Sequence, residues 1–161
     1  MSSIAFLASL RPFAIPQEIQ DKQNQITFKT EEELLSFSVQ PLDDYWLKET
    51  EGLFTLPYLY EAYGLEHTDF LLYLEKYMET GDVLEIYSVP NQHGFSMYKQ
   101  KLLERPRPIH INVGCHTYRD TFGLYQLTHD NWVTELSHRH YLSEHGITTF
   151  VKYLSIGLEA L

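Results

Sequence analysis

Histidine is the first residue type in this sequence that suggests chemistry. Six of the eight histidines lie between positions 110 and 145. An imidazole can bind a metal ion or transfer a proton near neutral pH, so this clustering defines a candidate polar site. The side chains that such a site would gather from neighbouring elements are those of His110, Asn112, His116, His138 and His140.

The spacing of these histidines argues against a metal centre. His110 and His116 share one face of a predicted strand, but their six-residue separation is roughly 20 Å at about 3.3 Å per residue, whereas zinc ligands lie only about 2 Å from the ion. Glu135 and His138 have the spacing that carboxylate-bridged metal sites use, yet such sites need a second copy. His138 and His140 point to nearly opposite sides of a helix but to the same side of a strand, so this pair is a ligand candidate only if the helix has ended by position 136. The sequence therefore predicts no metal and no cofactor.

The single cysteine does not form a nucleophilic pair with its neighbour. Cys115 and His116 are adjacent on the predicted strand, so their side chains point to opposite faces. A lone cysteine on an apolar strand face is usually a small core residue. One cysteine also excludes an internal disulfide and is typical of a reducing compartment, which favours a cytoplasmic location.

Familiar enzyme and membrane signatures are absent from the sequence. It contains no Gly-x-Ser-x-Gly, Gly-x-Gly-x-x-Gly or phosphate-loop motif. No run of about 18 apolar residues occurs, so no membrane-spanning helix is expected. The apolar residues near the N-terminus lack the preceding basic residues of a secretory signal, so we expect no export.

The acidity of the chain is concentrated in its middle. The net charge is −10, and residues 31–85 contain fourteen Asp or Glu with only Lys48 and Lys76 as basic residues. A negative field repels phosphate backbones and attracts basic surfaces, so we expect a basic protein partner and no general binding of nucleic acid. The one basic run, residues 99–108, is interpreted as an exposed, extended loop.

Large aromatic residues lie among these carboxylates and form the preferred candidate binding surface. Aromatic side chains anchor interfaces, and carboxylates steer a basic partner towards them. The competing interpretation places Tyr45 and Trp46 in the core and the acids in a solvated loop. The predicted partner-binding residues are Asp43, Asp44, Tyr45, Trp46, Glu49 and Glu51.

Two functional hypotheses follow from these residues. The preferred one is a small, acidic, non-catalytic protein-binding domain, of the inhibitor or immunity type, that occupies a basic bacterial partner. The alternative is a small enzyme or ligand-binding domain that uses the histidine-lined polar site. Convergence of the histidines in space would favour the second hypothesis.

Length and pattern predict the elements that must position both sites. With 161 residues the chain is expected to form one domain over residues 1–161. Alternating or apolar runs predict strands over residues 4–8, 25–29, 34–39, 83–89, 109–116, 124–127 and 147–154.

Two helices complete this assignment. Helical spacing and capping residues predict one helix over residues 69–79 and a second that starts after Thr128 and includes Leu136. Residues 53–63 suit an edge strand, a strand start or the N-terminus of a helix, because Pro57 is tolerated in all three. We therefore expect an α+β domain with a mixed or mainly antiparallel sheet and two to four helices.

Overall fold

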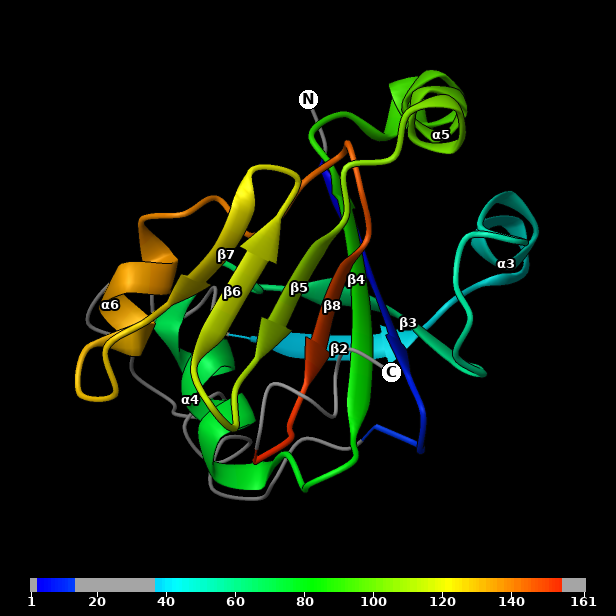
Figure 1. Ribbon diagram of the computed structural model, residues 1–161. Helices are drawn as coiled ribbons and strands as arrows, with labels where there is room; N and C mark the ends of the chain where they lie inside the picture. Colours follow the sequence, from blue (N-terminus) through cyan, green and yellow to red (C-terminus); the bar gives the residue numbers. More distant parts are fainter. Residues whose placement is uncertain (1–2, 14–36, 155–161) are drawn as a thin grey trace, which may run out of the picture.

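A computed structural model describes residues 3–13 and 37–154 and contains one mixed sheet with helices on both faces (Figure 1). Within these residues the sheet has eight strands in the order β2-β3-β1-β4-β8-β5-β6-β7, and only β5 and β8 pair in parallel. The predicted α+β class is confirmed. The strands are β1 (Ile4–Ser9), β2 (Ser38–Pro41), β3 (Tyr58–Tyr63), β4 (Val83–Val89), β5 (Ile109–Asn112), β6 (Thr117–Asp120), β7 (Gly123–Gln126) and β8 (Thr148–Val151).

Four α-helices and one short 3-10 helix occur in the described part of the chain, within the predicted range. They are α3 (Asp44–Glu49), α4 (Thr68–Tyr77), the 3-10 helix η1 (Gln92–Gly94), α5 (Phe95–Glu104) and α6 (Trp132–Ser137). None of the helices in residues 3–13 and 37–154 has the length and apolar character needed to cross a membrane.

Each face of the sheet carries its own apolar core. In the first core, on one face, strand residues such as Leu7 and Ile86 pack with α4 and α6. In the second core, on the other face, Phe6 and Tyr87 pack with α3 and α5. Figure 1 shows the two helix pairs on opposite sides of the sheet. Strands β1 and β4 are therefore buried on both faces, which explains why their sequences are almost continuously apolar.

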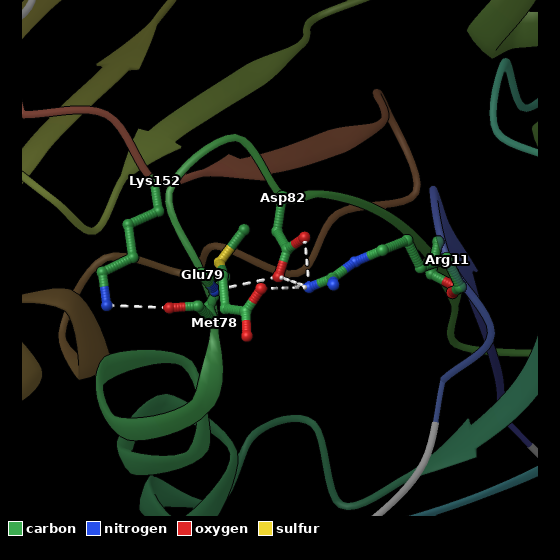
Figure 2. A network of polar contacts seen from close by, with 6 residues as sticks. Arg11, Met78, Glu79, Asp82 and Lys152 are labelled. Atoms are coloured by element: carbon green, nitrogen blue, oxygen red, sulfur yellow. Dashed lines mark hydrogen bonds and ion pairs between the residues drawn. The ribbon is translucent and has the colours of Figure 1, made fainter.

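A polar network connects the residues that follow β1, α4 and β8 with the residue before β4 (Figure 2). The Arg11 guanidinium, just after β1, lies 2.7 Å from each carboxylate oxygen of Asp82. It also lies 3.2 Å from one carboxylate oxygen of Glu79. Lys152, just after β8, donates to the carbonyl oxygen of Met78 at 2.8 Å. Cations at the C-terminal end of α4 complement the helix dipole. Two of the central carboxylates, those of Glu79 and Asp82, are thus paired with Arg11 of this same chain.

Most predicted elements are present with shifted ends. Strand β1 extends the prediction of 4–8 by one residue, β4 matches 83–89, and β8 covers the centre of 147–154. Helix α4 begins at Thr68 and ends at Tyr77, instead of covering 69–79. The ambiguous segment before Tyr63 forms a strand, β3, that begins directly after Pro57.

Other predictions fell partly or wholly on residues that are not described. The strand expected at 25–29 lies outside the described residues, as does the first half of the strand expected at 34–39. The second half of that segment contains the start of β2, at Ser38.

The predicted strand over 109–116 is wrong in its second half. Strand β5 ends at Asn112, and residues 113–116 form the turn to β6. Cys115 lies half-buried in this turn instead of on an apolar strand face, and His116 has a φ of 57°. Gly114 in this turn allows the backbone to approach Tyr153 closely, because the Tyr153 carbonyl oxygen would be 2.1 Å from an added Cβ.

The structure of the basic run, residues 99–108, also differs from the predicted loop. Lys99 and Lys101 lie on α5, whose buried residues Phe95 and Leu102 face the second core. Only the last part of the run, residues 105–108, is extended and exposed. The apolar residues of α5 have helical spacing, and the two prolines that suggested an extended loop both lie after the end of this helix.

Buried tyrosines make the fold sensitive to alkali. Burial, followed by the nearby Glu144 carboxylate, raises the pKa of Tyr87 to about 12. In the unfolded chain this hydroxyl titrates near 10, with a pKa of about 10 for free tyrosine. The contribution of Tyr87 to the free energy of unfolding should therefore be constant below pH about 10 and fall above it, because the unfolded chain loses the proton first.

Denaturant unfolding at several pH values between 8 and 11.5 measures this effect. Tyr87→Phe should show a shallower decline than the wild type above pH about 10. Equal slopes for the two proteins would contradict a native-state pKa that is raised at this residue.

Candidate functional site

Helix α3 positions the predicted acidic aromatic surface. Asp43 is its N-cap, and Oδ1 of this residue accepts a hydrogen bond of 3.0 Å from the backbone N–H of Trp46. Asp44 lies in the first turn and Lys48 in the last, as the helix dipole favours. The sequence Asp-Asp-Tyr-Trp thus starts a short helix, and Asp43 has a structural role in it.

The two aromatic residues of α3 point into different environments. Trp46 is only 8% exposed, and its ring centroid lies 5.4 Å from that of Phe6 and 5.2 Å from that of Phe95. Tyr45 is 63% exposed and meets the Trp46 ring edge-on at 5.0 Å. Trp46 therefore belongs to the second core, while Tyr45 projects from it into solvent.

A pocket of about 380 Å³ opens between α3 and the segment formed by η1 and α5. Lys99 on α5 links the two elements, because its Nζ donates to the carbonyl oxygen of Glu49 at 2.8 Å. Three of the predicted partner-binding residues therefore meet residues from a distant part of the sequence. The pocket is lined by Tyr45, Trp46, Glu49, Gln92, His93, Phe95 and Ser96.

This lining suits a positively charged group. Aromatic faces attract cations through their quadrupole, and a carboxylate such as that of Glu49 adds charge and hydrogen-bond acceptors. Glu49 is half-buried, whereas Asp44 and Glu51 are exposed. Of these three acidic residues, Glu49 lines the pocket.

No protein-family model, curated protein or solved structure matches this sequence. Any function must therefore be inferred from the residues of this chain.

A larger pocket, of about 470 Å³, lies beside the end of β1. Its charged residues, Arg11 and Asp82, already bind each other. The aromatic residues Tyr73 and Tyr77 also line it, and burial raises the pKa of Tyr73 to about 12. This pocket lacks a charged group that is left to recognise a ligand, so we prefer the pocket beside α3.

The predicted histidine-lined site is distributed over several structural environments. His110 is half-buried on β5, whereas His138 and His140 are exposed after the end of α6. Asn112 is completely buried, and its Oδ1 accepts from the backbone N–H groups of Gly114 and Tyr153 at 2.9 and 3.0 Å. Asn112 therefore has a structural role, since it fastens the β5–β6 turn to the end of β8.

His116 contacts another histidine. Its Nδ1 lies 3.4 Å from that of His129, a residue outside the predicted set. Burial lowers the pKa of His116, His129 lowers it further, and the more distant Glu75 opposes both effects. Across residues 3–13 and 37–154, no three His, Cys, Asp or Glu side chains converge on a common metal position.

Sequence reasoning missed two further polar features. Glu85 is a buried carboxylate on β4 that accepts from the backbone N–H groups of Thr55 and Leu56 at 2.8 and 3.0 Å, and from the Thr55 hydroxyl. A charged residue inside an apolar strand was the available signal. His129 gave no such signal, because its partner lies thirteen residues away across a hairpin.

Proposed function

We propose that this chain is a non-catalytic binding domain that captures an arginine or lysine side chain of a basic protein partner in the pocket beside α3. The observation that carries the proposal is the joint lining of this pocket by the exposed Tyr45, the aromatic Trp46 and the acidic Glu49. A cation over an aromatic ring contributes about 0.5–1 kcal/mol when exposed and about 2 kcal/mol when desolvated.

The surrounding charge supports the same kind of partner. Asp44 and Glu51 are exposed and lie within two residues of the lining residues Tyr45 and Glu49 in the sequence, and residues 37–85 as a whole are rich in acids. Such a field accelerates association with a basic surface and weakens as salt is added. Inhibitors and immunity-type proteins that cover a basic site use this combination, and we extend the proposal to that class.

A titration with Nα-acetyl-arginine methylamide tests the pocket directly. Nuclear magnetic resonance of the isotope-labelled full chain should show shifts that saturate and are concentrated at Tyr45, Glu49, His93 and Phe95. The matched anionic probe, Nα-acetyl-glutamate methylamide, should leave these signals in place. Shifts spread evenly over the acidic residues between 37 and 85 would contradict a specific cation pocket.

A pair of double variants provides the matched control. Tyr45→Ala with Glu49→Gln removes one exposed tyrosine and one carboxylate from the pocket. Tyr63→Ala with Glu61→Gln makes the same change on β3, where the Tyr63 hydroxyl contacts the Glu61 carboxylate. The first pair should abolish the saturable shifts and the second should preserve them. Loss of the shifts in both would show that general acidity, and not the pocket, attracts the probe.

A further inference from the structure

His116 and His129 present two ring nitrogens at the separation of metal ligands. Their Nδ1 atoms lie 3.4 Å apart. Two nitrogen ligands of a tetrahedral ion, each at about 2.0–2.1 Å from it, are about 3.3–3.4 Å from each other. We propose that these two histidines bind one transition-metal ion, Zn²⁺ or Cu²⁺, through Nδ1.

The backbone holds His116 in position before any ion arrives. His116 is the one non-glycine residue with positive φ among residues 3–13 and 37–154, and this conformation is unfavourable for a side chain with a Cβ. The carbonyl oxygen of His116 accepts from the backbone N–H of Leu127 at 2.8 Å and from Nε2 of Gln126 at 3.2 Å. These bonds fix the turn, so little ordering is left to oppose ligand binding.

The surroundings of the pair favour a cation without closing the site. The His116 ring packs 5.4 Å from the buried ring of Trp132, which limits its rotation. Glu75 on α4 acts electrostatically on His116 and adds negative charge nearby. Because no third ligand side chain converges on the pair within the described residues, water would complete the coordination. His129 is exposed, so an ion has access.

The ligand type selects the ion. Imidazole nitrogens suit zinc, copper and nickel, whereas magnesium and calcium require oxygen ligands. The expected order of affinity is Cu²⁺ above Zn²⁺, with Mg²⁺ and Ca²⁺ excluded. The sequence-based expectation of no metal site considered pairs on a single element, and this pair instead joins the β5–β6 turn to the loop before α6.

Calorimetric titration of the chelator-treated full chain with ZnSO₄ tests the proposal. We expect one equivalent to bind. Loss of supporting residues around metal ligands typically costs about 10–100-fold in affinity, so loss of either ligand should weaken binding by at least about tenfold. His116→Asn is the preferred variant, because asparagine tolerates positive φ and keeps the turn. His129→Gln removes the second ligand from an exposed position.

His138→Gln and His140→Gln serve as controls, since both residues are exposed and lie outside the pair. They should bind Zn²⁺ as the wild type does. Cobalt(II) absorption provides a second readout, with visible bands in the wild type that His116→Asn removes. Equal zinc affinity of the wild type and the His116→Asn/His129→Gln double variant would overturn the proposal. Equal binding of Mg²⁺ and Zn²⁺ by the wild type would do the same.

Discussion

Replacement of Trp46 by alanine is expected to lower the free energy of unfolding by about 3–5 kcal/mol, the usual cost of removing a large buried aromatic side chain. Trp46 is buried, and its ring packs with the rings of Phe6 and Phe95 in the core between the sheet and α3 and α5. Folded domains are stable by only about 5–15 kcal/mol, so this loss is large. Guanidinium denaturation followed by circular dichroism measures it.

Tyr45→Ala is the matched comparison on the same helix. Tyr45 is mostly exposed, so its loss should change the free energy of unfolding by less than about 1 kcal/mol. A cost below about 1 kcal/mol for Trp46→Ala as well would contradict the placement of Trp46 in the core. The comparison also determines which variants are suitable for binding experiments.

Gly146→Ala is expected to destabilise the fold by about 3 kcal/mol or more, because overpacking against rigid backbone exceeds the usual cost of about 1–3 kcal/mol. An added Cβ would lie 2.0 Å from the carbonyl oxygen of Arg107 and 2.9 Å from the nitrogen of Pro108. The two backbones are tied there by the bonds from Arg107 N–H to His145 and from Ile109 N–H to Ile147. Neither can move without disturbing the only parallel strand pair in the described sheet, β5 and β8.

Gly123→Ala is the control for this substitution. The same added methyl group would lie 3.6 Å from the Tyr125 hydroxyl, an ordinary contact. Its effect should stay within about 1 kcal/mol in either direction. Thermal unfolding compares the two variants, and a similar melting temperature for both would show that the close approach at Gly146 is readily relieved.

The elements with a strong period were predictable from the sequence. Residues 83–89 are mostly apolar apart from Glu85 and Ser88, residues 148–151 are apolar or β-branched, and both segments form strands. Residues 68–77 have helical spacing with a polar start. Local preference and burial point to the same structure in these segments, so tertiary contacts shift only their ends.

The two helices that form the candidate pocket were not predicted, although each has a local signal. In α3 the signal is the capping residue Asp43, three positions before Trp46, and in α5 it is the helical spacing of Phe95, Tyr98 and Leu102. Both helices are short or weakly capped, and their stability comes from packing against the sheet. Pattern within one segment does not reveal that packing.

The pocket between α3 and α5 could not be predicted from the sequence, because its lining residues come from two distant segments. Glu49 and Phe95 are far apart in the chain, and the contact of Lys99 with the Glu49 carbonyl oxygen joins two helices that are separate in sequence. The structure also separates the roles of the six predicted residues. Asp43 caps a helix and Trp46 supports the core, so Tyr45 and Glu49 are the residues to change when binding is measured.

Affinity purification of the tagged full chain from its native cells, at low and at moderate salt, tests the central claim most directly. It should include the wild type, the Tyr45→Ala/Glu49→Gln variant and the Tyr63→Ala/Glu61→Gln control. We predict that the wild type and the control recover the same basic protein in equal amount, less at higher salt, and that the pocket variant does not. Recovery of that protein by all three, or of no basic protein by the wild type, would contradict the proposed function.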